Sequence, residues 1–157
     1  MLEAAQYKEV AKYFEDFEIG ETRTTAARTI TETDFIMHAM HSGDWMPHHT
    51  DVEWCKTQPF KKPIIHGNAT FSISTGLCIQ GEPLNPHGMS YGYDKIRYPN
   101  PVFAGDTIKV KVTIIEKKDH PKRSTHGLLT EEKITTNQKG EVVCVAHHVL
   151  FVEKRNP

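Results

Sequence analysis

Cysteine is scarce in this chain of 157 residues: Cys55, Cys78 and Cys144 are widely spaced, and no C-x-x-C pair occurs. An odd number of isolated cysteines argues against a disulfide framework and fits reduced, partly buried thiols. Cys78 as a nucleophile is the sharper alternative, but no feature around it in the sequence favours the thiolate that such chemistry needs. We therefore expect a reducing compartment and no disulfides.

Long apolar runs are also missing. No stretch approaches the roughly 20 residues that a membrane-spanning helix needs. The start, Met1-Leu2-Glu3-Ala4-Ala5-Gln6, carries polar residues where a signal peptide has its apolar core. These two observations predict a cytoplasmic protein without a membrane partner.

Neither sign of charge dominates, because 19 basic side chains stand against 20 acidic ones. Bulk electrostatics therefore do not predict a nucleic-acid partner. Local basic residues could meet substrate phosphates, although a solvated surface is the better interpretation from sequence; they are Lys95, Arg97, Lys117, Lys118, Lys122 and Arg123.

Histidine, by contrast, is frequent, with ten residues that include the pairs His48-His49 and His147-His148. Metal ligands usually recur at helical i, i+4 spacing or on alternate strand residues. Adjacent histidines in a strand point to opposite faces instead. We therefore predict no metal site, with zinc as a minor alternative.

The order of apolar and polar residues predicts a single α+β domain spanning residues 1–157, helical in its first half and antiparallel in its second. Expected helices cover residues 2–12, a segment after the capping sequence 31–34, 51–57, and the uncharged run 67–79. Expected strands cover residues 21–30, 91–98, 107–116, 128–136 and 141–153, the last two joined by a turn at 137–140. A long uncharged helix needs a sheet to wrap it, and the later strands supply one.

The most informative segment is Ser42-Gly43-Asp44-Trp45-Met46-Pro47-His48-His49-Thr50-Asp51. An aspartate five positions before a histidine, in a chain bent by proline, brings an acceptor and an imidazole together without regular structure. Asp44 and His49 would then share one water, one group taking its proton while the other orients the oxygen. The alternative is a loop aspartate that caps backbone N–H groups and a histidine satisfied by a hydrogen bond.

His66 and Gly67 follow at the head of the predicted central helix. The Gly67 N–H lacks a partner within the helix, so it can stabilise an oxygen that gains negative charge. Gly67 is equally well explained as a close-packing glycine. His66 has no catalytic role here: it is a capping or packing residue or a substrate contact. Thr75 lies two turns into the helix, where hydroxyls usually bond back to the chain.

At these residues the chain resembles the MaoC-like dehydratases, the (R)-specific 2-enoyl-CoA hydratases of the hotdog fold. The resemblance begins at Phe14-Glu15-Asp16-Phe17-Glu18-Ile19-Gly20 and is renewed at Pro101-Val102-Phe103-Ala104-Gly105-Asp106-Thr107. Between them it runs through Ser42-Gly43-Asp44, Pro47, His49, Asp51, Phe60 and Pro63-Ile64-Ile65-His66-Gly67. Nearly the whole chain is covered.

The resemblance implies a long helix wrapped by an antiparallel sheet, and homodimers or dimers of dimers as the assembly. It implies that Asp44 and His49 activate water, that Gly67 polarises the thioester carbonyl, and that the Thr75 hydroxyl assists. Met46 stands where the family usually has asparagine, so a flexible apolar group replaces an amide near the substrate. We expect Met46 to affect acyl preference while leaving the Asp44–His49 pair in place.

The resulting hypothesis is a hydratase–dehydratase acting on a 2-enoyl thioester, carried by CoA or by an acyl carrier protein, without a cofactor. It would give an (R)-3-hydroxyacyl thioester. Two alternatives stay open: a hotdog thioesterase that directs water at the carbonyl carbon, and an acyl-thioester binding subunit without turnover.

Overall fold

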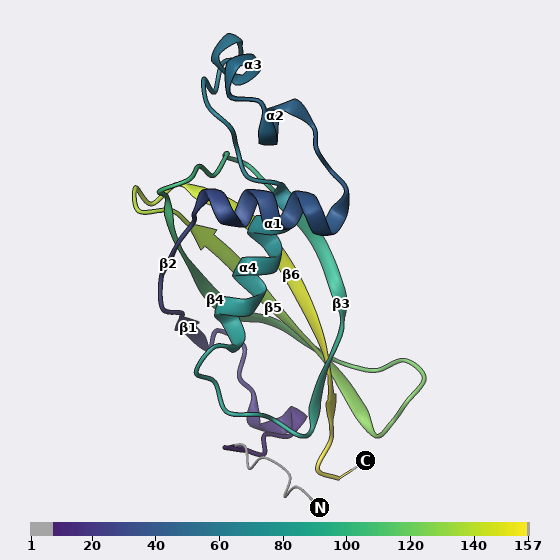
Figure 1. The fold of residues 1–157 in the computed structure, drawn as a ribbon. Helices are drawn as coiled ribbons and strands as arrows, with labels where there is room; N and C mark the ends of the chain where they lie inside the picture. Colours follow the sequence, from purple (N-terminus) through teal and green to yellow (C-terminus); the bar gives the residue numbers. More distant parts are fainter. Residues whose placement is uncertain (1–7, 157) are drawn as a thin grey trace, which may run out of the picture.

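The central helix of the fold, α4 (Gly67–Ile79), lies across an antiparallel sheet in the computed structural model, which describes residues 8–156 (Figure 1). Its bounds agree with the uncharged run of the sequence. The small residues along the helix let the sheet approach closely, and Ala69, Ser74 and Cys78 are buried. This arrangement of a sheet wrapped around one long helix is the hotdog fold, so the predicted α+β class is confirmed.

The sheet orders its strands β1-β4-β5-β6-β3, and β2 pairs separately with β4. The strands are β1 (Thr22–Thr24), β2 (Arg28–Thr29), β3 (Gly88–Arg97), β4 (Thr107–Asp119), β5 (His126–Thr136) and β6 (Val142–Glu153). The predicted strand over residues 21–30 is therefore two short pieces, because residues 25–27 interrupt the regular ladder with β4, where Thr25 bonds to Val110. The four long strands were all predicted, with ends that differ by a few residues.

Helices α1 (Glu32–Ser42), α2 (Pro47–Thr50) and α3 (Val52–Thr57) precede α4 in the chain, and α2 and α3 lie beyond one end of the sheet (Figure 1). Helix α1 begins at Thr31, whose backbone N–H donates to Asp34 Oδ2 at 2.8 Å, as the capping sequence predicts. It ends at Gly43, which has the left-handed φ of 77°. The short helices α2 and α3 follow, with Asp51 accepting the Trp54 N–H at the start of α3.

The N-terminal segment differs from expectation. Most of the predicted helix over residues 2–12 lies outside the described residues. Residues 8–12 are not helical: Glu9 forms a parallel bridge with Leu84, and a one-turn 3-10 helix, η1 (Phe14–Asp16), follows. Backbone pairing with the loop after α4 therefore outweighs the local apolar spacing.

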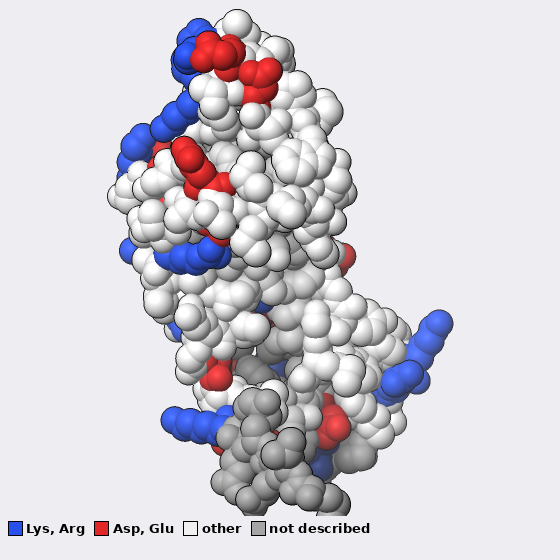
Figure 2. All heavy atoms as spheres, viewed as in Figure 1, with Lys and Arg blue, Asp and Glu red and all other residues white. Residues whose placement is uncertain are grey.

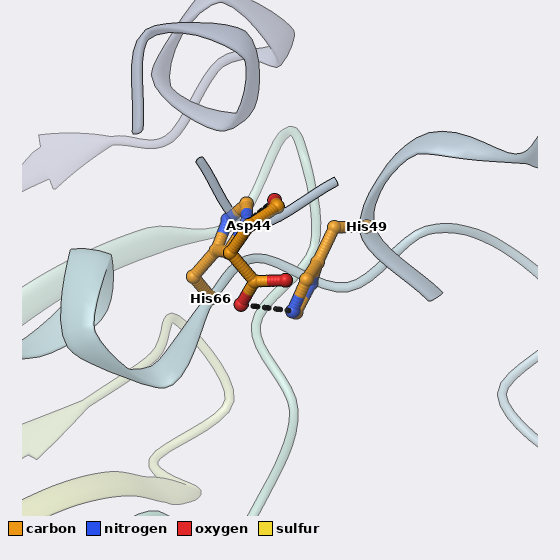
Figure 3. A group of neighbouring side chains, drawn as sticks. All are labelled: Asp44, His49 and His66. Atoms are coloured by element: carbon orange, nitrogen blue, oxygen red, sulfur yellow. Dashed lines mark hydrogen bonds and ion pairs between the residues drawn. The ribbon is translucent and has the colours of Figure 1, made fainter. Parts of the chain in front are cut away.

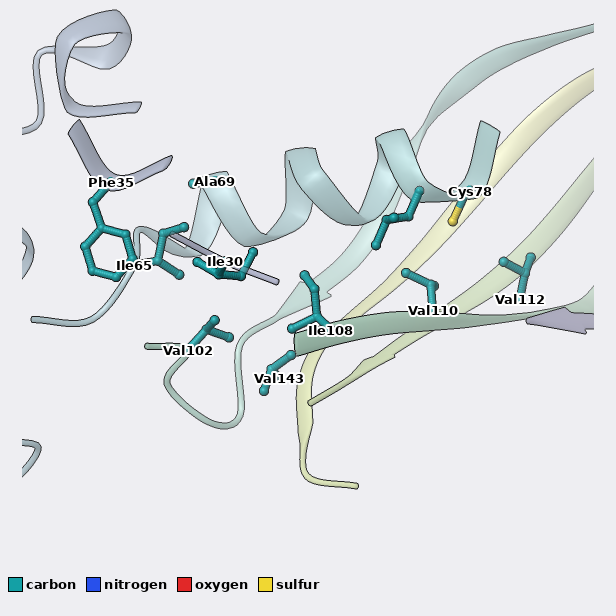
Figure 4. Packing of buried hydrophobic residues seen from close by; sticks show 11 residues of the cluster. Ile30, Phe35, Ile65, Ala69, Cys78, Val102, Ile108, Val110, Val112 and Val143 are labelled. Carbon is teal, nitrogen blue, oxygen red and sulfur yellow. The ribbon is translucent and has the colours of Figure 1, made fainter. Parts of the chain in front are cut away.

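The main hydrophobic core lies between α4 and the sheet (Figure 4). Alternate residues of β4, namely Ile108, Val110 and Val112, face Leu77 and Cys78 of the helix. The other members are Ala69 of α4, Phe35 of α1, Val143 of β6, and Ile30, Ile65 and Val102 of the connecting segments. Because Ile65 and Val102 belong to this core, the chain on both sides of the head of α4 is held in place.

Candidate active site

The segment between α1 and α2 carries Asp44 and is held by its own side chains. Ser42 Oγ donates to the His38 carbonyl at 2.7 Å and accepts the Asp44 N–H at 3.2 Å. Asp44 Oδ1 accepts the Met46 N–H at 3.2 Å, which makes a tight Asx turn. Helical structure begins at Pro47, earlier than the predicted helix over residues 51–57, because Pro47 fits the first position of a helix and starts α2.

His49 lies on α2, and its side chain is 7 % exposed. Its Nδ1 is 2.7 Å from the carbonyl oxygen of Ile64. A carbonyl only accepts, so neutral His49 carries its proton on Nδ1 and leaves a lone pair on Nε2. Nε2 lies 3.9 Å from Asp44 Oδ2 (Figure 3). The predicted pair of acceptor and imidazole is thus brought together, with the basic nitrogen facing the carboxylate.

The surroundings of His49 favour its neutral form. Burial lowers the pKa of His49, and the neighbouring His66 and His48 lower it further; the Ile64 carbonyl and the Asp44 carboxylate act in the opposite direction. The net effect is a lowered pKa. A neutral imidazole is the form that can take a proton from water.

Gly67 is the first residue of α4, and the hydrogen bonds among the described residues give its N–H no partner. The ring of Tyr98 lies across this position, so an added Cβ would be 2.6 Å from Tyr98 Cδ2. Packing therefore requires glycine here, which agrees with the interpretation of Gly67 as a close-packing residue. The free N–H at the positive end of the helix is available as well, and the two roles are compatible.

An open cavity of about 450 Å³ adjoins this site. His49 and Gly67 both line it, and most of the remaining wall is apolar, including Phe60, Ile64 and Val143. A substrate carbonyl at Gly67 would therefore have an apolar space next to it.

His66 is buried between the other site residues, which the sequence did not indicate. Its ring stacks on His49, with centroids 3.7 Å apart and planes 25° apart, and contacts His38 at 4.6 Å. Its Nε2 lies 2.9 Å from the main-chain oxygen of Asp44. His66 therefore contacts both members of the pair.

Asp44, His49 and His66 place one potential metal-ligand atom each within 4.8 Å of one another. The stacked rings of His49 and His66 hold their nitrogen lone pairs in nearly parallel planes, so both cannot point at one ion unless a ring turns. His66 Nε2 is also engaged with the Asp44 carbonyl. The arrangement does not fit a metal centre, and we keep the prediction of a metal-free site.

Two candidate residues lie outside this group. Thr75 is eight residues beyond Gly67 on α4, a rise of about 12 Å, and its hydroxyl donates to the Phe71 carbonyl at 3.0 Å. Its assistance in catalysis thus rests on the resemblance alone. Met46 is 55 % exposed and caps the start of α2 beside Trp45, so its side chain is free to meet a substrate.

The remaining nucleophile and basic residues have other contacts. All three cysteines are free and buried, and burial raises the pKa of the Cys78 thiol, which disfavours the thiolate. Lys118 pairs with Glu116, and Arg123 lies over the Phe151 ring. No helix among residues 8–156 is both long enough and apolar enough to cross a bilayer.

Comparison with known proteins identifies the family. The family described as "MaoC like domain" matches residues 15–137, so the chain belongs to it. Protein MaoC of Klebsiella aerogenes is 34% identical over 113 residues, which cover 72% of this chain; the chain spans only about a third (33%) of that protein. An (R)-specific enoyl-CoA hydratase of Rhodospirillum rubrum is 30% identical over 81% of this chain and 78% of its own length.

A solved structure supports the same assignment. The chain resembles a protein described as "Monoamine oxidase regulatory protein from Archaeoglobus fulgius", with a TM-score of 0.85 and 34% identity over 92% of this chain and 95% of that one. The chain is therefore a member of a hydratase/dehydratase family related to acyl-CoA metabolism.

Proposed function

We propose that this protein adds water to a 2-enoyl-CoA, or removes it in the reverse direction, with an (R)-3-hydroxyacyl-CoA as the hydrated partner. One observation carries the proposal: His49 Nε2, deprotonated and 3.9 Å from Asp44 Oδ2, faces the carboxylate, and His49 lines the same cavity as Gly67 with its free N–H. A water can hydrogen-bond to both groups at about 2.8 Å from each. The (R) product and the CoA carrier follow the names of the relatives.

In this mechanism the carbonyl oxygen of the thioester accepts the Gly67 N–H. Water held by Asp44 and His49 attacks C3, and one of these two groups takes its proton. The electrons of the double bond move toward the carbonyl, where the enolate oxygen is stabilised by the N–H and by the positive end of α4. The group that took the proton from water returns it to C2, so atoms and charge balance without a cofactor.

The proposal is tested by incubating the protein with 2-enoyl-CoA esters of several chain lengths. We expect loss of the absorbance of the conjugated thioester without release of free thiol. His49→Gln should slow this by about 10²–10⁴-fold, the usual contribution of a positioned acid–base group. His41→Gln, a change at an exposed histidine near the end of α1, is the matched control and should remain active.

The alternatives give different results in the same assay. A thioesterase releases thiol as fast as substrate disappears and accepts saturated esters equally well. A binding subunit binds acyl-CoA but changes neither signal. Full activity of a folded His49→Gln variant would remove His49 from the mechanism.

We further propose that the protein acts as a homodimer in the cytoplasm. Strand β3 supports the dimer because it is the last strand of the sheet and exposes Met89 (65 %) and Tyr91 (60 %). The face seen in Figure 2 carries few charges over the middle of the molecule. The three free cysteines fit a reducing compartment. Light scattering after gel filtration should give the mass of two chains; a single-chain mass contradicts the dimer.

A further inference from the structure

His66 is a buried residue for which the proposed chemistry has no function. Only 3 % of it is exposed, and it lies directly before the helix that supplies the Gly67 N–H. Its side chain points away from its own helix toward the main chain of Asp44, 22 residues earlier (Figure 3). A capping histidine would bond to the helix start, but no side-chain cap bond is present. The local explanation for His66 therefore fails.

The protonation of His66 follows from its partners. The Asp44 main-chain oxygen only accepts, so Nε2 of His66 carries a proton and donates it over 2.9 Å. In the neutral imidazole Nδ1 is then an acceptor, and it is buried without any hydrogen-bond partner among the described residues. Leaving a buried acceptor unpaired is unfavourable, so its presence in a folded protein calls for an explanation. The histidine is thus kept for its other contacts.

These contacts act on both members of the catalytic pair. Asp44 is 44 % exposed at its side chain, and its segment carries no amide at position 46 that could brace it. The bond from His66 ties its main chain to the head of α4. The same ring covers one face of His49 at a centroid distance of 3.7 Å, which limits rotation of that imidazole.

We propose that His66 is a positioning residue of the hydration reaction. Its Nε2–H and its ring hold Asp44 and His49 where both can bind the same water. The inference rests on the proposed function, and it adds the group that aligns the pair. It also gives a physical reason for tolerating Met46: His66 adds a brace from across the site to the Ser42 and Asp44 bonds within the segment.

Three substitutions of His66 distinguish the contribution of its Nε2–H from that of its ring. His66→Gln places an amide N–H near the position of Nε2, His66→Asn places one near Nδ1, and His66→Phe keeps the ring without any N–H. We expect kcat to fall by roughly 10²-fold in the Phe and Asn variants with KM little changed, because misplacement by about 1 Å costs that much. His66→Gln should retain kcat within tenfold, an estimate from the same principle. His87→Gln, which removes a stacked histidine elsewhere, is the control.

A second readout does not require activity. The charged groups and histidines facing His49 are Asp44, His48 and His66, and the Asp44 carboxylate favours the charged imidazole. Asp44→Asn should therefore lower the pKa of His49, measured by NMR titration, in the wild-type and His66→Gln proteins. In the His66→Phe protein the same change should have little effect, because Asp44 is no longer held beside His49.

Wild-type kcat in a folded His66→Phe variant overturns the inference, as does a His66→Gln variant as slow as the Phe variant. An undiminished effect of Asp44→Asn in the His66→Phe background does the same. If the wild-type protein hydrates no enoyl-CoA, the proposed function fails, while the NMR comparison still decides whether His66 holds Asp44.

Discussion

At the scale of single residues, the Ile64 carbonyl decides the chemical state of His49. By accepting the Nδ1 proton it leaves Nε2 basic, while burial and two neighbouring histidines lower the pKa of the ring. Nothing in the spacing of Asp44 and His49 indicates this arrangement. It arises because the segment before Gly67 packs against α2, where the Ile64 N–H also donates to the His48 carbonyl at 3.0 Å.

This arrangement predicts the pH dependence of hydration. Since the pKa of His49 is lowered from its ordinary value of about 6.5, the neutral base persists to lower pH. The acidic limb of kcat/KM plotted against pH should therefore have its midpoint below 6.5, the same ordinary value. Stopped assays between pH 4.5 and 8, a range chosen around that value, measure it. A midpoint above the ordinary value would show that the Asp44 charge outweighs burial.

Gly67→Ala should change stability in the opposite direction from the usual Gly→Ala substitution in a helix. Gly→Ala normally stabilises a helix by about 0.5–1 kcal/mol, but here the new methyl would collide with the Tyr98 ring. Gly67→Ala should destabilise the protein by about 1–3 kcal/mol, the range for overpacking. In a Tyr98→Ala background the same change should be neutral or stabilising.

Denaturant unfolding of the four proteins of this cycle measures the coupling. Gly76→Ala is the control on the same helix, since nothing lies within 4 Å of its added Cβ. Equal effects of Gly67→Ala in both backgrounds would contradict a packing role for the glycine.

At the scale of elements, local signals located most boundaries. The capping sequence at Thr31 starts α1, and the uncharged run gives α4 to the residue. Local signals failed where pairing with another strand determines the ends of an element. Residues 21–30 are threonine-rich and were predicted as one strand, but they form β1 and β2, because only two short parts pair regularly with β4.

The burial of charged side chains on the inward face of β5 and β6 was not predicted either. Lys133 Nζ lies 2.9 Å from His148 Nδ1 and 3.4 Å from Glu131 Oε2, and all three side chains are at most 11 % exposed. The adjacent His147 points the other way and lies 3.4 Å from Glu132, as alternation predicts. Periodicity shows which residues share a face, but it does not show that a charged face can be buried when its members pair.

The Glu131 carboxylate predicts a pH dependence of stability. Burial raises its pKa, but the hydrogen bond with His148 and the charges of Lys133 and Arg23 outweigh burial, so the net pKa is lowered. Its contribution is therefore present above the unfolded value of about 4.3 and is lost as the pH falls through the folded pKa. Glu131→Gln should cost about 3–5 kcal/mol at pH 7, the range for breaking a buried pair.

Urea unfolding at a series of pH values tests this, with the exposed Glu18→Gln as control. The difference between Glu131→Gln and wild type should shrink as the pH drops below about 4.3. A difference that does not change with pH would mean that the glutamine fails through packing and not through charge.

At the scale of the whole molecule, the fold brings the site together from three separate segments. Asp44 follows α1, His49 lies on α2, and His66 and Gly67 open α4. The sequence predicts the first two and the helix start as candidates, because each carries its own local motif. It does not predict that His66 joins Asp44 to α4, since that contact depends on how α1 and α4 pack.

The central claim is that water bound between Asp44 and His49 attacks C3 of an enoyl-CoA. The most direct measurement is a reaction in ¹⁸O-labelled water with mass spectrometry of the products. The account predicts label in a 3-hydroxyl group of an intact CoA ester, and almost none with the His49→Gln variant. Label in a free carboxylate, with CoA released, would contradict it and identify a thioesterase.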